Sequence, residues 1–130
     1  LVHAGWRGTL SRIGACALAV LQEHYGTSPA AVLAAVGPAI GPCCYAVGPD
    51  VAAAFAREFP GGDVVRGSPD GVWRVDLWTA NWRVLREAGV GAANIAVAGR
   101  CTACALDEFF SHRASGGKTG RMAAIMMLDE

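Results

Sequence analysis

The five cysteines are the residues of this sequence whose type and spacing point most directly to chemistry. Cys16 stands alone, Cys43 and Cys44 are adjacent, and Cys101 and Cys104 form a CxxC pair. A thiolate is both a nucleophile and a ligand for soft metal ions, and its pKa falls beside a metal or a cation. An odd number of cysteines in an apolar chain of 130 residues indicates reduced thiols rather than the paired scaffold of a secreted protein.

The adjacent cysteines lie in the segment GPAIGPCCYAVG, residues 37–48, whose glycines and prolines predict a shaped loop. Neighbouring side chains of an extended loop point in opposite directions. We therefore expect one functional cysteine and one that packs as a small apolar residue. Cys43 is the candidate functional thiol, and Cys44 is the one we expect to be packed.

The CxxC pair is typical of a redox site or of half a structural zinc site. A structural zinc site needs a second pair of ligands, and the remaining candidate pair is the CC dipeptide, which lacks the usual spacing. A redox pair normally opens a helix that follows a strand, and the residues between Cys101 and Cys104 are compatible with that arrangement. We therefore expect that Cys104 does not bind a metal ion and does not form a disulfide bond.

His3 lies at the point where an apolar run meets the glycine turn of LVHAGWRG. Glycine beside it lets the backbone approach a ligand closely. A single histidine is either a metal ligand or a hydrogen-bonded structural residue, and the residues alone leave both alternatives open.

Cations on turns are the candidates for binding an anion. An arginine on a glycine-rich turn suits two-point binding of phosphate or carboxylate, and the alternative is a solvated charge or a cap on a carbonyl group. Arg7 and Arg121 are the best candidates because each lies inside a glycine-bearing turn. The turn cations are Arg7, Arg100, Arg113, Lys118 and Arg121.

Hydrophobic periodicity predicts the elements that position these residues. Helices are expected over residues 9–25 or 11–25, from residue 29 for one turn, and over 49–59, 76–89 and 106–112. Strands are expected over residues 32–36, near 64–65, and over 72–77, 95–98 and 121–128, with residues 1–4 a strand if something precedes them. This mixture predicts a single domain, residues 1–130, of the α/β or α+β class, with a mixed-sheet sandwich and flanking helices.

The composition narrows the class of protein. Eleven basic and eleven acidic residues cancel, which argues against a nucleic-acid partner. Apolar residues make up 53% of the chain, but charged residues interrupt every apolar run before it reaches the length of a membrane span, and the N-terminus does not read as a secretory signal. We therefore expect a cytoplasmic protein without a membrane partner; the sequence gives no indication of its oligomeric state.

Four stretches of the sequence together resemble one protein family. They are HAGWRGTL at 3–10, GPAIGPCCYAVG at 37–48, VDLW at 75–78 with Asn81, and RCTAC, FFSHR and GKTGRMAAIMML between 100 and 128. In this order they are similar to the multicopper polyphenol oxidase or laccase-domain family, whose members look like purine nucleoside phosphorylases with adenosine deaminase activity. The resemblance implies a mixed α/β sandwich similar to cysteine hydrolases.

The resemblance also implies a set of site residues. The family's metal site has a histidine, a cysteine and a second histidine, with zinc as the expected ion and copper as the alternative. The first histidine matches His3, and the cysteine matches Cys43, or alternatively Cys44. Arg7 is then a catalytic residue beside His3 and Cys43, and the residues expected to bind the substrate or phosphate are Arg7, Arg113, Arg121 and Thr102.

The implied substrates are a purine nucleoside and inorganic phosphate. A metal ion with three protein ligands leaves an open position at which water loses a proton near neutral pH, ready to attack C6 of a purine. Phosphorolysis instead requires a phosphate held beside C1′ of the ribose.

The sequence departs from the family in two ways. The second histidine is expected after the GPCC loop, where the chain has AREFPGGD, and neither His24 nor His112 matches its place. Family members are about twice as long, with an N-terminal half that includes an Ala-Asp-Cys segment. The alternatives are an active enzyme whose site is completed by another residue or chain, a truncated or diverged member with weak metal binding, a non-catalytic binding module, and a copper-dependent polyphenol oxidase.

Overall fold

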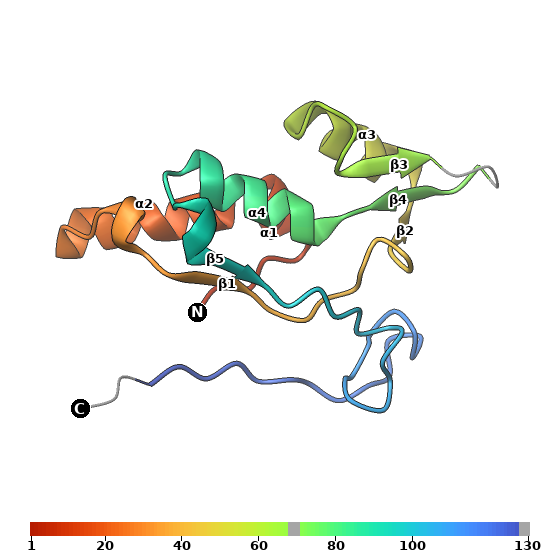
Figure 1. Ribbon diagram of the computed structural model, residues 1–130. Helices are drawn as coiled ribbons and strands as arrows, with labels where there is room; N and C mark the ends of the chain where they lie inside the picture. The colour runs from red at the N-terminus through yellow and green to blue at the C-terminus, as the bar shows by residue number, and fades with distance from the viewer. Residues whose placement is uncertain (68–70, 128–130) are drawn as a thin grey trace.

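Helices and short strands are mixed along residues 1–67 and 71–127, which are the residues that the computed structural model describes (Figure 1). In chain order the elements are α1 (Trp6–Leu10), α2 (Ile13–Tyr25), η1 (Pro29–Ala31), β1 (Ala34–Val36), β2 (Ala46–Val47), α3 (Pro49–Glu58), β3 (Val65–Gly67), β4 (Trp73–Val75), α4 (Leu77–Glu87), η2 (Ala92–Asn94) and β5 (Ile95–Val97).

The predicted helix ending at residue 25 is two helices. The chain turns between α1 and α2 at Arg12, whose φ of 52° is in the left-handed region. The Arg12 guanidinium pairs there with Glu58, at 2.9 Å, and with Glu87. Gly26, with φ of 65°, ends α2 as the sequence predicts.

The sequence also explains how α3 and α4 begin. Pro49 occupies the first turn of α3, where its missing N–H costs no hydrogen bond. Asp76 caps α4, because its carboxylate accepts hydrogen bonds from the backbone N–H groups of Trp78 and Thr79, each at 3.0 Å. Asp76 also ends the predicted strand over 72–77, which is shortened to β4.

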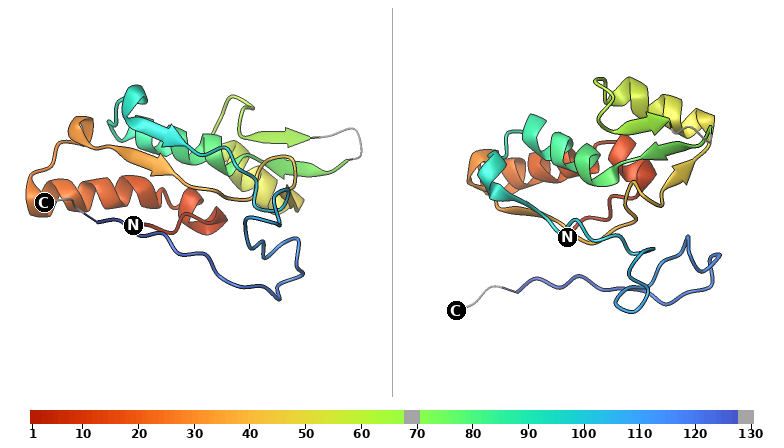
Figure 2. Two further views of the ribbon diagram at one scale, coloured as in Figure 1. Left: turned by 60° about the horizontal axis from the view of Figure 1, so that its bottom comes forward. Right: turned by 45° about the vertical axis from the view of Figure 1, so that its right-hand side comes forward.

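The strands form two small sheets, one parallel and one antiparallel. β1 pairs with β5 in parallel, and β4 lies between β2 and β3 as an antiparallel neighbour of both. Helix α4 contacts both strands of the parallel pair, and α3 packs on the antiparallel sheet (Figures 1 and 2). The predicted mixed α/β class is confirmed.

The main core lies between the antiparallel sheet and helices α1, α3 and α4. Phe55 and Phe59 stack at its centre, with ring centroids 5.9 Å apart. Removing such side chains from water is the main favourable contribution to folding. The buried residues of this core are Tyr45, Phe55, Phe59, Val64, Val75, Leu77, Ala80 and Val84.

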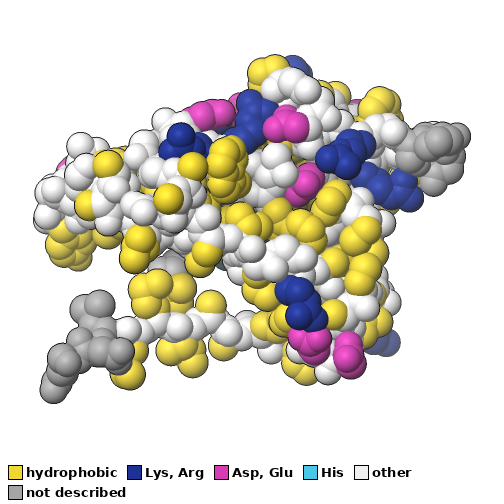
Figure 3. Space-filling model, in the orientation of Figure 1, with side chains coloured by type: hydrophobic (Ala, Val, Ile, Leu, Met, Phe, Trp, Pro, Cys, Tyr) yellow, Lys and Arg dark blue, Asp and Glu magenta, His cyan; other side chains and the backbone are white. Residues whose placement is uncertain are grey.

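Three predicted elements differ from the structure. Residues 106–112 form turns and not a helix. The Phe109 N–H bonds to the Ala105 carbonyl at 2.9 Å, but the backbone bonds described for the N–H groups of residues 110–114 do not repeat that spacing. Residues 1–4 form no strand. Residues 121–127 are extended but pair with no described strand, and their apolar side chains are exposed, Ile125 at 89% (Figure 3). Position 128 lies outside the described residues.

None of the helices in the described ranges has the length and apolar character that a membrane span requires.

Candidate metal centre

The parallel pairing of β1 with β5 brings two cysteine-bearing loops together. The strands run side by side from the Ala34 and Ile95 pair to the Val36 and Val97 pair. The pairing resumes at a bridge between Ala39 and Cys101. Because parallel strands end at the same edge of a sheet, the loops that follow β1 and β5 are held next to one another.

Each loop presents two sulfur atoms from a single tight turn. In the first, the N–H groups of Cys44 and Tyr45 both donate to the carbonyl oxygen of Gly41, at 3.0 and 2.9 Å. In the second, the N–H groups of Cys104 and Ala105 both donate to the carbonyl oxygen of Cys101, at 3.2 Å. These bonds curl each loop, so that both of its thiols face the other loop.

The result is the four-cysteine cluster, which consists of Cys43, Cys44, Cys101 and Cys104. Their Sγ atoms all lie within 4.8 Å of one another. The Sγ of Cys104 is 3.6 Å from that of Cys43 and 3.4 Å from that of Cys44. All four thiols are free, and Cys16 lies apart on α2.

The two cysteine pairs lie together although their spacing in the sequence does not indicate it. By its spacing alone, the CC dipeptide is a poor candidate for the second pair of a structural zinc site. A helical turn at Gly41 supplies the required geometry, and Cys104 makes direct sulfur contacts with both Cys43 and Cys44. Cys44, expected to be packed away, is only half-buried and faces the cluster.

Cys101 is the thiol of the cluster whose pKa is lowered, whereas the pKa values of the other three are raised. Burial raises the pKa of the Cys101 thiol. Hydrogen bonds from the backbone N–H groups of Gly41, Ala103 and Cys104 act in the opposite direction and outweigh burial, so the pKa falls to about 6. For Cys43 the direction is opposite, because burial and the hydrogen bonds with Cys101 and Cys104 raise the pKa of its thiol. Cys101 is therefore the thiol of the cluster that loses its proton most readily, and the sequence does not reveal this because one of its amide donors, Gly41, lies 60 positions away.

His3 lies outside the four-cysteine cluster. It is exposed in the segment leading to α1, and its imidazole folds over Gly5, where a Cβ atom would be 3.0 Å from Nε2. Among residues 1–67 and 71–127, the four cysteines are the one group of three or more candidate metal ligands. The predicted pairing of His3 with Cys43 stays a prediction.

The residues predicted to bind phosphate are dispersed. The Arg7 guanidinium stacks on Trp6 at 4.3 Å from the ring centroid, and Arg121 donates to the carbonyl oxygens of Thr119 and Gly120, at 2.9 and 3.1 Å. Arg113 and Thr102 lie beside the cysteine loops instead.

Arg113 joins the C-terminal turns to the loop of Cys43 and Cys44. It donates to the Ala46 carbonyl at 2.6 Å, and its guanidinium lies 5.0 Å from the ring centroid of Tyr45. Thr102 is buried, and its N–H donates to the Ala39 carbonyl at 3.1 Å. Of the predicted anion-binding residues, these two are the ones placed near the cluster.

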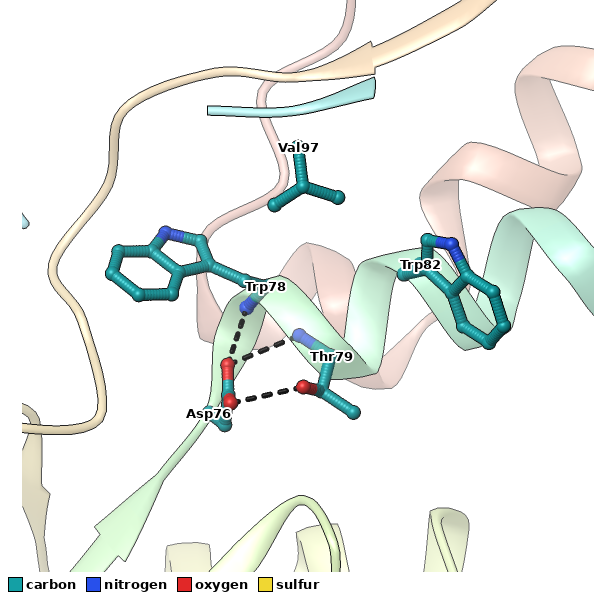
Figure 4. A pocket seen from close by; sticks show the side chains of 5 residues that line it. All are labelled: Asp76, Trp78, Thr79, Trp82 and Val97. Atoms are coloured by element: carbon teal, nitrogen blue, oxygen red, sulfur yellow. Dashed lines mark hydrogen bonds between the residues drawn. The ribbon is translucent and has the colours of Figure 1, made fainter. Parts of the chain in front are cut away.

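A cavity of about 220 Å³ opens at the start of α4 (Figure 4). It is lined by Asp76, Trp78, Thr79, Trp82 and Val97. Both carboxylate oxygens of Asp76 are used within the helix cap, the second by Thr79 Oγ1 at 2.9 Å. The indole Nε1 of Trp78 is buried without a hydrogen-bond partner in the described part of the chain. The carboxylate of Asp76 is therefore not left free for a ligand in this cavity.

Comparison with known proteins gives matches along nearly the whole chain. A family model described as multi-copper polyphenol oxidoreductase laccase matches residues 1–129. Purine nucleoside phosphorylase YlmD of Geobacillus stearothermophilus is 40% identical over 128 residues, which are 97% of this chain and 47% of the relative. Adenosine deaminase RL5, from an unknown prokaryotic organism, is 43% identical over 123 residues, 92% of this chain and 46% of that protein.

Solved structures agree with these matches. The crystal structure of YlmD from Geobacillus stearothermophilus superposes with a TM-score of 0.81 at 38% identity, covering 92% of this chain and 45% of that one. The crystal structure of the hypothetical protein YfiH from Bacillus licheniformis gives the same TM-score at 35% identity, with the same coverage. The chain spans about half the length of the curated relatives it matches.

Proposed function

This chain belongs to the multi-copper polyphenol oxidoreductase laccase family, and we propose that it forms part of an enzyme acting on purine nucleosides. The proposed reactions are phosphorolysis of a nucleoside to free base and ribose 1-phosphate, and hydrolytic deamination of adenosine. The observation that carries this proposal is the 40% identity to a purine nucleoside phosphorylase along 97% of the chain. The similarity to an adenosine deaminase along 92% of the chain supports the second reaction.

His3 is the proposed ligand of the catalytic metal. Its imidazole is exposed at the entrance to α1, and a buried hydrogen-bond chain fixes the residue after it: Asn81 donates to Thr9 Oγ1 at 3.0 Å, and Thr9 donates to the Ala4 carbonyl at 3.2 Å. We propose zinc as the ion, with copper as the second candidate; either would supply a Lewis acid. The described residues do not complete such a site, because Cys43 lies with the other cysteines and His3 is outside that group.

Phosphate binding is proposed for Arg7, Arg121, Arg113 and Thr102. Arg7 follows His3 by four positions and is exposed. We propose that its guanidinium binds an anion near the imidazole. Arg121 contacts only backbone carbonyls in the bonds it makes within the described chain, which leaves its charge for a ligand. An arginine that binds a phosphate at two points would offset part of its charge and help to orient it toward C1′ of the ribose.

We propose that residues 1–130 act as one domain, the C-terminal part of the family fold, in the cytoplasm. The free thiols suit a reducing compartment. The proposed partners are small molecules, a purine nucleoside and phosphate, and the zero net charge does not favour a nucleic acid.

Product analysis tests the proposed function. The protein is incubated with inosine or adenosine, with and without phosphate, and the products are separated by chromatography. Phosphorolysis is expected to yield free base only when phosphate is present, with ribose 1-phosphate in equal amount. Deamination is expected to yield inosine from adenosine without phosphate. Absence of both products from protein that binds metal would contradict the proposal.

A further inference from the structure

We propose that the four-cysteine cluster holds one zinc ion as a closed, structural tetrathiolate site that ties the loop after β1 to the loop after β5. The site takes up both Cys43 and Cys44, so it would replace the predicted pairing of either cysteine with His3. The proposal rests on the sulfur geometry and not on nucleoside turnover, so it and the proposed function can each fail without the other.

The sulfur positions match the size of a zinc site. Tetrahedral zinc with Zn–S bonds of about 2.3 Å separates its sulfur ligands by about 3.8 Å. The two separations of Cys104 from Cys43 and Cys44 are 3.6 and 3.4 Å, and no pair in the cluster exceeds 4.8 Å. Disulfide bonds would require sulfur atoms at about 2.0 Å, so the cluster has the dimensions of four thiols around an ion.

The number and type of ligands select the ion. Four thiolates in a tetrahedron are typical of zinc or iron–sulfur sites. Sulfur atoms this close leave no room for the irons and sulfides that separate the thiolates of an iron–sulfur cluster, so a single ion fits. With four protein ligands no coordination position stays open for water, which is the mark of a structural zinc site rather than a catalytic one.

Backbone donors around the cluster favour charged sulfur. The Gly41 N–H donates to the Sγ of Cys101 at 3.2 Å, in a buried position. Hydrogen bonds of this kind orient metal ligands and offset the excess negative charge of a tetrathiolate site. Gly41 also has to lack a side chain, because a Cβ atom there would meet Trp78 Cη2 at 2.6 Å. The amide donor and the sulfur are therefore held by packing.

The position of the cluster in the fold gives the ion a structural role. Residues 98–127 contain no helix and no strand. The pairing described for them is a single β-bridge, between Ala39 and Cys101. The cluster joins positions 60 and 61 residues apart at the point where this irregular segment leaves β5. Binding of zinc would release the protons of the neutral thiols and fix the segment to the loop of residues 41–45.

Metal content and a cobalt spectrum test this proposal. The protein is produced in zinc-containing medium, and bound zinc is counted by mass spectrometry for the parent, Cys44→Ser, Cys104→Ser and the control Cys16→Ser. Each cluster variant is expected to hold one zinc per chain fewer than the parent, and Cys16→Ser the same number as the parent. Cys16 is a suitable control because it is exposed and outside the cluster.

Cobalt provides a readout that does not depend on folding of the variants. In the parent, Co²⁺ exchanged for zinc is expected to give strong visible bands of tetrahedral geometry and the near-ultraviolet charge transfer of several thiolates. The same spectrum in His3→Ala would show that the site is separate from His3, whatever happens to nucleoside turnover. A parent spectrum without multiple thiolate ligands, or unchanged zinc content in both cluster variants, would overturn the proposal.

Discussion

The backbone nitrogen of Gly41 lies 3.2 Å from the sulfur of Cys101, although the two residues are 60 positions apart. Two neighbouring contacts fix its position. Trp78 packs against the open side of Gly41, and the bridge from Ala39 to Cys101 fixes the two chains in register. The contact therefore couples the packing of α4 to the geometry of the cysteine loops.

Replacing Gly41 with alanine is expected to destabilise this contact. The new Cβ would lie 2.6 Å from Trp78 Cη2 and 3.2 Å from the Cβ of Cys101, so either the indole or the loop must move. Overpacking of this kind costs about 1–3 kcal/mol in the free energy of unfolding, measured by urea denaturation. Gly37→Ala is the matched control, since a Cβ there has nothing within 4 Å. Equal stability of the two variants would contradict the tight packing of Gly41.

Replacing Thr9 with valine is expected to break the buried hydrogen-bond chain behind His3. Thr9 is fully buried, and its hydroxyl accepts from Asn81 and donates to the Ala4 carbonyl. Loss of the hydroxyl leaves both partners short of a hydrogen bond, at a cost of about 1–3 kcal/mol in unfolding free energy. Thr27→Val makes the same substitution at a half-buried site and is expected to cost less. Equal losses of unfolding free energy in the two variants would contradict a stabilising role of the hydrogen bonds of Thr9.

His3→Ala is expected to abolish adenosine deamination while leaving the fold intact. An exposed imidazole contributes little to packing, so the melting temperature should stay within about 2 °C of the parent. Loss of a metal ligand should lower kcat/KM by more than about 100-fold. His24→Ala, on the exposed end of α2, is the control and should keep parent activity. A His3→Ala protein with parent turnover would remove His3 from the catalytic site.

Arg121 and Arg113 are expected to differ in what their loss affects. Arg121→Ala should raise the KM for phosphate about tenfold with little loss of stability, because its bonds within the chain are to neighbouring carbonyls. Arg113→Ala should also lower the melting temperature, since it removes the bond to Ala46 and the stacking on Tyr45. Arg57→Ala on α3 is the control for phosphate kinetics. An unchanged phosphate KM in Arg121→Ala would contradict its proposed role.

The ion pair between Arg12 and Glu87 is expected to make stability depend on pH. The hydrogen bond from Arg12 holds the pKa of Glu87 below its ordinary value of 4.5, so the stabilisation is present above that value and is lost as pH falls through the lower pKa of the folded state. Both side chains are partly exposed, which limits the effect to about 0.5–1 kcal/mol. Urea denaturation should give a lower free energy of unfolding for Glu87→Gln than for the parent near neutral pH. The difference between the two should vanish in acid. A difference that persists in acid would assign the effect to packing.

Local signals in the sequence predict much of the fold. Pro49 and Asp76 mark the first turns of α3 and α4, and Gly26 marks the end of α2, because each acts through its own backbone or cap. Long-range contacts explain the differences. The turn at Arg12 depends on Glu58 and Glu87, which no local pattern reveals, and residues 121–127 have a strand-like sequence without a described partner strand.

The candidate metal centre shows the same division. Each cysteine pair is visible in the sequence, and each follows a short apolar run, residues 32–36 and 95–98. Treating those runs as one parallel strand pair would have placed the two cysteine loops at the same sheet edge. The spacing of the CC dipeptide does not reveal this proximity, because a tight turn brings the two adjacent thiols to a third sulfur.

The indole of Trp78, packed on Gly41 beside Cys101, gives the protein an internal optical reporter. Its buried Nε1 has no hydrogen-bond partner among the described residues, so any water or side chain that reaches it on loosening of the loop would shift its emission to longer wavelength. The other three tryptophans, at positions 6, 73 and 82, can be replaced with phenylalanine to isolate this signal. Movement of the cysteine loops could then be followed by fluorescence in real time, without an attached dye.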